Sequence, residues 1–202
     1  APTIVNLRLA TSSAPYVYGN HTASANQAVG NALYYANGYL YVGLTTTQSG
    51  AGFHVIDVSN PLAPVWKGSW PLAASMNGVS SGAPISGITV KGTYAYVSHP
   101  TGLTGATSEQ LTVLDISNPT APVRVSGHTS AGGSASAAGK STMAVGPKLY
   151  FGRTASDNSS ADAIPEFFIL DISNPASIPA AAIGSLGLGI SDPAVTAHDI
   201  AR

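Results

Sequence analysis

A nine-residue string that occurs three times organises the whole chain. Its copies are Asp57-Val58-Ser59-Asn60-Pro61-Leu62-Ala63-Pro64-Val65, Asp115-Ile116-Ser117-Asn118-Pro119-Thr120-Ala121-Pro122-Val123 and Asp171-Ile172-Ser173-Asn174-Pro175-Ala176-Ser177-Ile178-Pro179. From Asp57 to Asp115 is 58 positions and from Asp115 to Asp171 is 56, which is the length of a supersecondary unit. The sequence therefore predicts a repeat architecture, and it indicates far more about fold than about chemical activity.

Each copy of the string is predicted to end a strand in a fixed turn. Short apolar runs rich in branched and aromatic side chains come just before it, at 53–56, 111–114 and 167–170, and such runs indicate strands. The Asp can accept a hydrogen bond from the backbone N–H two residues on, and Pro keeps the preceding Asn extended and ends the ladder. We therefore assign a structural turn role to the repeated residues Asp57, Asn60, Pro61, Asp115, Asn118, Pro119, Asp171, Asn174 and Pro175.

The intervals between the strings divide one repeat domain into three units. Residues 27–70, 84–128 and 139–188 each contain the pattern of four short strands, and we expect each unit to form a four-stranded antiparallel blade. Residues 1–11 resemble the closing strand of a preceding unit, and residues 194–202 align with the opening strand of a further unit. The prediction is three blades with an orphan strand at each end.

The second repeat carries a family resemblance most clearly. It has the strand Gly92-Thr93-Tyr94-Ala95-Tyr96-Val97, then a variable loop, an apolar strand and the turn at Asp115. This order resembles the LVIVD-repeat family over about residues 27–188, although the third repeat departs from it with Gly146-Pro147-Lys148 and an extra residue before Pro179. The resemblance implies a β-propeller fold and a secreted or surface-attached bacterial protein, and it brings no catalytic residues to transfer.

Three blades do not complete an ordinary propeller, which has four to eight. A longer chain, a partner copy, or orphan strands that share a blade between neighbouring subunits could complete it, and the last arrangement gives a filament if its rotation does not close. Middle strands of packed blades are covered on both faces, which suits the run Phe167-Phe168-Ile169-Leu170. The alternative fold is a β-trefoil or another threefold β fold, for which repeats of this length are long.

Composition limits the classes of partner. Only 8% of residues are charged and the net charge is −1, so there is no basic patch for nucleic acid. No apolar stretch approaches the length of a membrane span. Cysteine is absent, which excludes disulfides and thiol chemistry. The chain begins at Ala1 without Met, which we interpret as an exported protein after removal of its signal, although an incompletely determined sequence would begin in the same way.

Two short motifs resemble catalytic or phosphate-binding signatures. Residues 78–82 fit the Gly-x-Ser-x-Gly pattern of a nucleophile elbow, but they lie in a polar stretch between blades without a strand-turn-helix context. Residues 133–141 resemble a phosphate-binding loop, but they have five residues between the glycines and run into a predicted strand, where phosphate binding needs a helix. We expect no catalytic residue and no cofactor.

The sequence contains no recognisable metal-binding motif, and it contains two glycosylation-type sequons. The histidines are scattered without metal-ligand spacing, and the acidic residues of one loop could supply oxygen ligands for Ca²⁺ but match no calcium loop. Two sequons that could accept glycans begin at Asn20 and Asn158. The residues considered as metal ligands are His21, His54, His99, His128, His198, Asp157, Asp162 and Glu166.

From these features we rank three candidate functions. The first is a non-enzymatic extracellular structural or adhesive protein that assembles through its incomplete ends, as a homo-oligomer, fibre or surface-layer subunit. The second is a segment of a longer closed propeller that binds a small molecule, glycan or protein at its axis. The third is a lectin-like threefold domain with sugar sites in three loops, which the different lengths and compositions of the loops disfavour.

Overall fold

The computed structural model describes six stretches of the chain, residues 29–45, 51–71, 84–99, 109–129, 139–153 and 165–187. Over these stretches the chain forms strands and no helix. The strands are β1 (Val29–Ala36), β2 (Tyr39–Thr45), β3 (Ala51–Asp57), β4 (Val65–Pro71), β5 (Gly87–Lys91), β6 (Tyr94–Ser98), β7 (Leu111–Asp115), β8 (Val123–His128), β9 (Gly139–Val145), β10 (Lys148–Arg153), β11 (Phe167–Asp171) and β12 (Gly184–Leu186).

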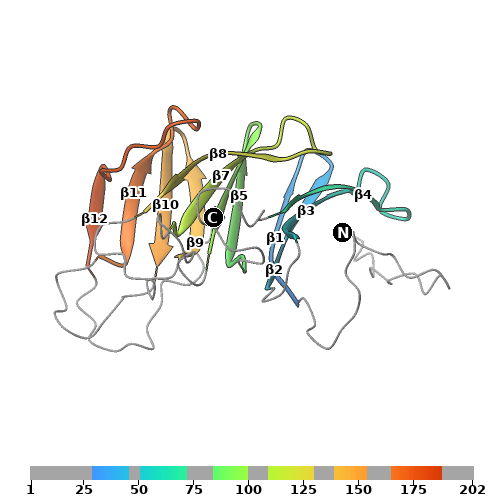
Figure 1. Ribbon diagram of the computed structural model, residues 1–202, viewed down its shortest axis with the longest axis horizontal. Coiled ribbons are helices and arrows are strands. Elements are labelled where there is room, and N and C mark those ends of the chain that lie inside the picture. The colour runs from blue at the N-terminus through green and yellow to red at the C-terminus, as the bar shows by residue number, and fades with distance from the viewer. Residues whose placement is uncertain are drawn as a thin grey trace, which may run out of the picture.

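The strands form three separate four-stranded sheets, in which each strand pairs with the next one along the chain (Figure 1). All the pairs are antiparallel. We call the sheets blade 1 (β1–β4), blade 2 (β5–β8) and blade 3 (β9–β12). The predicted all-β fold, an array of four-stranded antiparallel blades, is confirmed, and this sequential order is the one that propeller blades have.

The three blades have the same register. Tyr39, Tyr94 and Lys148 occupy equivalent positions, because each is paired with the Asp that ends the third strand of its blade. The first hairpin of each blade turns through a glycine with positive φ, at Gly38, Gly92 and Gly146. Glycine adopts this conformation without a steric penalty, so the hairpin is tight in every blade. Any position in one blade can therefore be matched to its counterparts in the other two.

The blades stand side by side in chain order, with their first strands adjacent. Strand β1 lies against β5, and β5 lies against β9, whereas the fourth strands make no comparable contact with another blade, and β4 and β12 lie at the two ends of the array (Figure 1). First strands on the inside and fourth strands on the outside are the arrangement of blades around a propeller axis. Among the described residues, blade 2 has a neighbour on both faces, and blades 1 and 3 each have a neighbour on one face.

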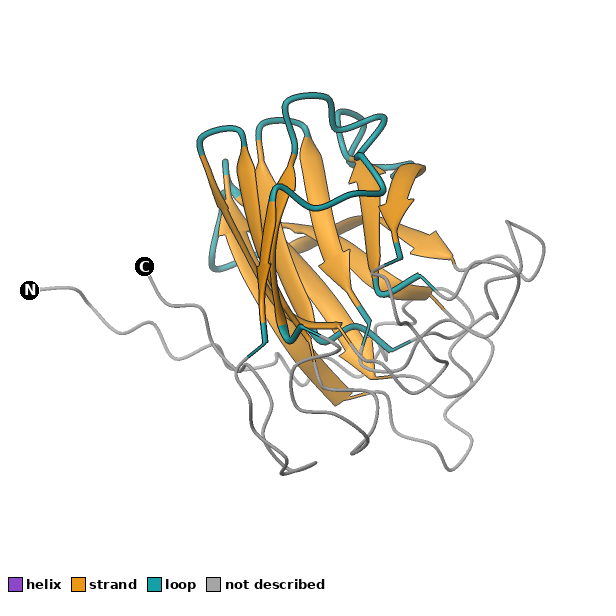
Figure 2. Ribbon diagram, turned by 90° about the vertical axis from the view of Figure 1, so that its left-hand side faces the viewer, coloured by secondary structure: helices purple, strands orange, loops and turns teal. Residues whose placement is uncertain are grey.

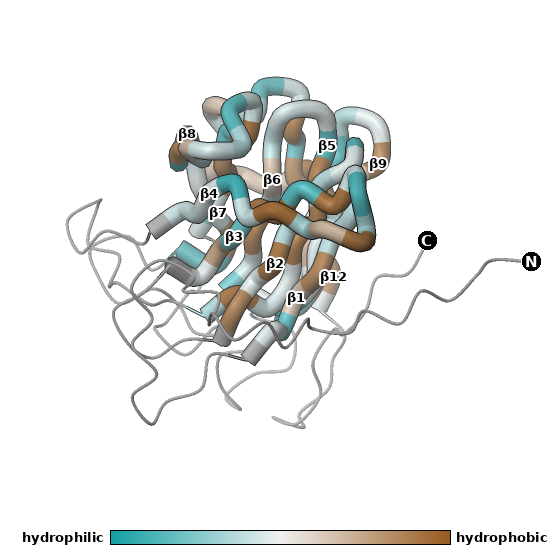
Figure 3. Tube along the Cα trace, turned by 90° about the vertical axis from the view of Figure 1, so that its right-hand side faces the viewer, coloured by the Kyte–Doolittle hydropathy of each residue, from teal (hydrophilic) through white to brown (hydrophobic). Residues whose placement is uncertain are grey.

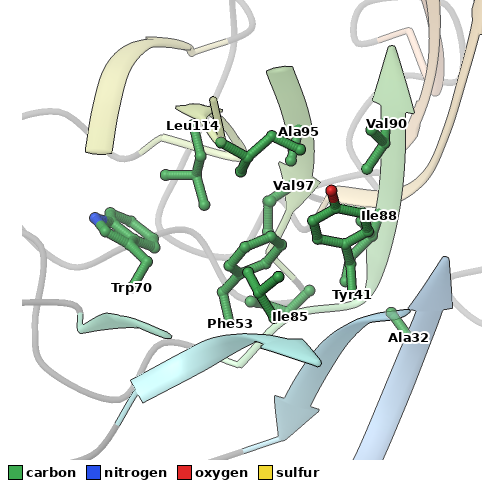
Figure 4. Packing of buried hydrophobic residues seen from close by; sticks show 12 residues of the cluster. Ala32, Tyr41, Phe53, Trp70, Ile85, Ile88, Val90, Ala95, Val97 and Leu114 are labelled. Carbon is green, nitrogen blue, oxygen red and sulfur yellow. The ribbon is translucent and has the colours of Figure 1, made fainter. Parts of the chain in front are cut away.

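The hydrophobic core lies between the blades. One cluster joins blades 1 and 2, and there Tyr41, Phe53 and Trp70 face Ile85 and Val97 of the next blade (Figure 4). A second cluster joins blades 2 and 3 in the same way. Because successive strand residues point to opposite faces, each covered blade contributes one set of apolar side chains to each neighbour. Packing between blades is therefore the main apolar contribution to stability.

Two kinds of connection lie at opposite rims of the array. The tight hairpins and the Asp turns lie at one rim, which we call the turn rim, and Val58 N–H donates to Gly38 C=O there, at 2.8 Å, to join turn to hairpin. The other ends of the strands, such as Thr45 and Ser98, lie at the opposite rim, and the described stretches of the chain end at or near them (Figure 2). The residues that recur in all three repeats, namely the hairpin glycines and the Asp turns, thus lie at the turn rim.

Several predicted features lie outside the described residues. These are the orphan strands at 1–11 and 194–202, the sequons at Asn20 and Asn158, and the Gly-x-Ser-x-Gly motif at 78–82. The phosphate-loop resemblance is described at its end only, where Gly139, Lys140 and Ser141 begin strand β9. A strand at this place agrees with our reason for rejecting that motif, since phosphate binding of that kind needs a helix N-terminus.

Candidate interaction surface at the ends of the blade array

The three turn aspartates make the same hydrogen bond in each blade. The Oδ1 atoms of Asp57, Asp115 and Asp171 accept the backbone N–H two residues on, at 3.0, 2.8 and 2.8 Å respectively. In the first and third turns the serine at that position also donates its Oγ–H, at 2.6 Å. The carboxylates are therefore engaged within their own turns.

The asparagines contribute a second bond, which the sequence interpretation did not include. The Oδ1 atoms of Asn60, Asn118 and Asn174 accept the N–H of the residue after the proline, at 3.1, 3.1 and 3.3 Å. The asparagine C=O groups then accept the next N–H, which closes the turn. Proline at the second position fixes φ for this turn, and the recurrence of Asn-Pro was the available signal.

These bonds also set the acidity of the turn carboxyls. The hydroxyl and backbone N–H of Ser59 lower the pKa of Asp57 to about 2, and Lys67 adds to the effect. Ser173 lowers the pKa of Asp171 in the same way. Over the described stretches, no three His, Asp or Glu side chains converge in an arrangement that could hold a metal ion. The repeated acids thus stabilise local structure.

A buried ion pair fastens the outer part of blade 2. Arg124 on β8 donates from Nη2 to Oε1 of Glu109 and from Nε to Oε2, the latter at 3.3 Å. The exposed fractions of the two side chains are 16% and 7%. Gly127 lies next to this carboxylate, and a Cβ there would collide with it. The absence of a side chain at Gly127 therefore makes room for the pair.

His99 is buried at the end of β6, although the sequence places it at the start of a loop. Its Nδ1 lies 3.2 Å from Pro84 C=O and its Nε2 lies 3.0 Å from Thr112 Oγ1. Because a carbonyl only accepts, Nδ1–H is the donor and Nε2 accepts from the threonine hydroxyl. Burial lowers the pKa of His99 to about 4. The neutral ring therefore joins blade 2 to the segment that enters it.

His99 makes the stability depend on pH in a predictable direction. Its pKa is about 4 in the folded chain and 6.5 ordinarily, so acid favours the unfolded chain. The contribution of His99 is complete above pH 6.5 and declines as the pH falls towards 4. We expect the free energy of unfolding of the wild type to fall, relative to His99→Gln, by about 3 kcal/mol between pH 7 and pH 4. Urea titrations of both proteins across this pH range measure the difference in the free energy of unfolding. The contributions of the carboxyl groups are the same in both proteins and cancel in this difference. Parallel pH profiles of the two proteins would contradict the prediction.

A polar layer with an aromatic centre joins blades 2 and 3 at the rim opposite the turns. The Arg153 guanidinium lies 5.1 Å from the centre of the Phe168 ring, and the His128 ring lies 6.4 Å from it. Arg153 Nε donates to Pro165 C=O at 2.7 Å, and burial lowers the pKa of Arg153, an effect that the charge of Glu166 opposes in part. Of the acidic loop considered for Ca²⁺, the described Glu166 thus interacts with a buried cation.

Hydrogen bonds from side-chain hydroxyls to backbone carbonyls, and close approaches of the backbone, join neighbouring blades. Thr89 Oγ1 donates to Thr142 C=O and Ser126 Oγ donates to Pro175 C=O, each at 2.6 Å, to join blade 2 to blade 3. Between blades 1 and 2, a Cβ on Gly68 would lie 2.6 Å from the carbonyl oxygen of Thr120. The turn of each later blade therefore rests against the fourth strand of the blade before it.

The face of blade 1 that points away from blade 2 carries apolar side chains, of which Leu33 and Tyr35 are exposed and the others half-buried. We call it the first end face, and it consists of Leu33, Tyr35, Leu40, Val42 and Ile56. Leu33 is paired with Val42 as Ile88 is paired with Val97, so Leu33 and Ile88 are equivalent. The exposed fraction is 66% for Leu33 and 7% for Ile88, which blade 1 covers. No described blade lies against this side of blade 1, and both residues are large and aliphatic, so the difference follows position in the array and not residue type.

The face of blade 3 that points away from blade 2 repeats this pattern. We call it the second end face, and it consists of Val145, Tyr150, Phe167, Ile169 and Leu186. The rings of Tyr150 and Phe167 stack with centroids 6.1 Å apart. Leu186 is paired with Phe167 as Trp70 is paired with Phe53, yet its exposed fraction is 57% against 4% for Trp70. Side chains at interface positions are thus left open at both ends of the array.

The sequence model of the LVIVD repeat matches residues 35–71, 85–128 and 161–181, which together make up just over half of the chain. The chain belongs to the LVIVD-repeat family. No curated protein matches it.

The LVIVD matches follow the blades described above. The first two matches include β2 to β4 and β5 to β8, whereas the third includes the Asp171 turn but not β9 and β10. This difference accompanies the Gly146-Pro147 hairpin, where the third repeat departs from the pattern of the others. The third strand of the blade and the turn that follows it are thus the part of the LVIVD repeat that is matched in all three blades.

One expectation about the third LVIVD repeat was only half right. Phe167 to Leu170 were expected to be covered on both faces, and Phe168 and Leu170 are indeed buried against blade 2. Phe167 and Ile169 are only half-buried, because no described strand covers the second end face. The described residues contain no helix with the length and apolar character of a membrane span.

Proposed function

We propose that this LVIVD-repeat protein is a non-enzymatic structural or adhesive protein outside the cell, which assembles through the two ends of its blade array. The observation that supports this function best is the pair of exposed apolar end faces. Leu40, Val42 and Ile56 of the first end face and Tyr150, Phe167 and Ile169 of the second occupy positions that are buried where two blades meet. Contiguous apolar faces of this kind usually mark interaction sites.

The two end faces differ from each other, which determines the type of assembly. Contacts between unlike surfaces generate rings if the rotation closes and filaments if it does not. The tube coloured by hydropathy shows apolar stretches along blade 1 seen from its end (Figure 3). A homo-oligomer, a fibre or a surface-layer subunit is compatible with this surface. Which of them forms depends on the rotation between successive copies.

Three further features support an extracellular, non-catalytic role. LVIVD-repeat proteins typically occur among secreted and surface-attached proteins. The repeated aspartates, which would be the natural candidates for catalysis, are used in turns. The low fraction of charged residues and the sequons at Asn20 and Asn158 suit a polar exterior that carries glycans. We propose no cofactor and no nucleic-acid partner.

The second candidate function is ligand binding at the axis of a larger propeller. The adjacent first strands, β1, β5 and β9, favour it, because such strands surround the axis when a propeller closes. In this case the end faces would be covered by further blades of a longer chain. The ligand would then be a small molecule, glycan or protein.

Electron microscopy and mass spectrometry of native material would separate the two candidates. We expect regular fibres or rings in the native material, and mass spectrometry of the same sample gives the mass of the chain that builds them and of any glycans. Sedimentation velocity of the purified 202-residue chain should show species larger than a monomer, which increase with concentration. Discrete rings made from a heavier chain would support the axial-binding function. A chain that stays monomeric at high concentration would contradict the assembly function.

A further inference from the structure

The two interfaces within the array are built on one plan. We call a side chain forward-pointing if it faces the blade that follows in the chain, and backward-pointing if it faces the blade that precedes. At each interface, forward-pointing side chains of one blade meet backward-pointing side chains of the next. Tyr41 and Phe53 point forward at the first interface, and their equivalents Tyr96 and Leu111 do so at the second. The repeated register therefore defines a general blade-to-blade interface with two unlike halves.

Among the described residues, one copy of each half has no neighbouring blade. The second end face carries forward-pointing residues, with Tyr150 and Phe167 at the positions of Tyr41 and Phe53. The first end face carries backward-pointing residues, with Leu33 at the position of Ile88. A forward-pointing half and a backward-pointing half are also what meet at each interface between blades within the array.

A contact between turn and glycine supports the same match. Gly68 is paired with Val55, and the turn at Thr120 of the next blade rests against it. Gly184 is paired with Ile169 at the equivalent position in blade 3, and the nearest atom to a Cβ there would be Ile169 Cδ1, at 3.9 Å. Leu62, the equivalent of Thr120, is 87% exposed in blade 1. Both partners of this contact are therefore present and open.

We propose that a second copy of this chain docks head to tail, with its first end face packed directly on the second end face and its turn at Leu62 over Gly184. This proposal rests on the proposed assembly function and specifies its surface. A second copy suits this site because the chain itself supplies the complementary half, in the register of two interfaces already formed. The five residues that define each end face are uncharged, whereas Lys148, exposed at the position of Tyr39 and Tyr94, lies at the turn-rim edge of the second end face and His54 lies opposite Val42 on the first.

Charged substitutions, one in each end face, test the proposal. Leu33→Lys blocks the first end face and Leu186→Lys blocks the second, and both side chains are exposed in the single chain. We expect each variant alone to raise the dissociation constant for self-association by at least about a hundredfold, because an unpaired charge would be buried. A mixture of the two variants should form a dimer with one copy of each and no larger species, since one open face remains on each partner. Sedimentation velocity measures these states.

Two further variants serve as controls. Val123→Lys introduces the same charge at an apolar residue that is 53% exposed in blade 2, whose faces are both covered, so it should associate like the wild type. Gly184→Val leaves the single chain unstrained, because its site is open, but should prevent the turn of a second copy from approaching. Circular dichroism melts verify that all variants are folded, and Gly184→Val tests the second end face even if Leu186→Lys unfolds.

The outcomes distinguish the surface from the function. If the wild type assembles and both blocked variants assemble equally well, direct docking of the end faces is wrong, while the assembly function stands. The same conclusion follows if deletion of residues 1–11 abolishes assembly and the blocked variants do not, because the terminal strand would then form the contact. If the wild type is monomeric, both proposals fail. Association of either blocked variant with itself would overturn the head-to-tail orientation.

Discussion

Replacing Arg124 with methionine is expected to lower the free energy of unfolding by about 3–5 kcal/mol. The substitution keeps an apolar chain of similar length but leaves the carboxylate of Glu109 without the guanidinium that both of its oxygen atoms contact. That carboxylate is buried beside Gly127, so water cannot replace the lost donors easily. Chemical denaturation monitored by tryptophan fluorescence measures the loss.

Two controls identify the buried charge as the cause. The double variant Glu109→Gln/Arg124→Met removes the stranded charge and should recover part of the lost stability. Lys67→Met breaks the more exposed pair with Asp57, at 3.2 Å, and should cost much less. If Arg124→Met costs no more than Lys67→Met, the pair in blade 2 contributes no more than a surface contact.

Phe53→Ala is expected to cost about 3–5 kcal/mol, whereas Phe167→Ala, at the equivalent position, should cost far less in the single chain. Phe53 is fully buried between blades 1 and 2, and its ring stacks on Tyr41 with centroids 5.9 Å apart. Its removal leaves a cavity that two packed sheets cannot close. Phe167 has the same residue type and register but lies half-buried on the second end face.

The pair of variants also reports on association. If a second copy covers the second end face, the cost of Phe167→Ala should rise with protein concentration, because binding to the folded chain adds to its stability. The cost of Phe53→Ala should not depend on concentration in this way. Thermal melts at several concentrations compare the two. Equal costs for both variants at low concentration would mean that the second end face is covered within the single chain.

The turns could be predicted from sequence because their chemistry is local. Asp57 and Ser59 are two residues apart, and Asn60 acts on the backbone two positions on, so all the partners are present in one short string. The hairpin glycines and the apolar runs are local signals too. This is why the blades and their order followed from sequence, and why the repeated acids received a structural role.

The buried polar groups could not be predicted in the same way. Glu109 and Arg124 are separated by a strand and a turn, and His99 contacts Thr112, which follows it by 13 positions. Nothing local in the sequence marks their burial, since polar residues next to loops are ordinarily exposed. Their partners become visible only when neighbouring strands are aligned.

The solvent exposure of the end faces could not be predicted from the sequence for another reason. Phe167 and Phe53 have similar sequence surroundings, and the same turn follows both. Their exposure differs because one has a neighbouring blade and the other has none among the described residues. Solvent exposure in such an array is a property of position, and a repeated sequence carries little information about which repeat is last.

The separation of the two rims leaves one side of the protein free to diversify. Short hairpins and Asp turns fix the spacing of the strands at the turn rim, where a change of length would alter the register of a blade. At the opposite rim, the strands need only be joined, and the cost of a longer connection grows slowly with its length. Insertions there could give related proteins different recognition properties while the blades, and the way they stack, stay the same.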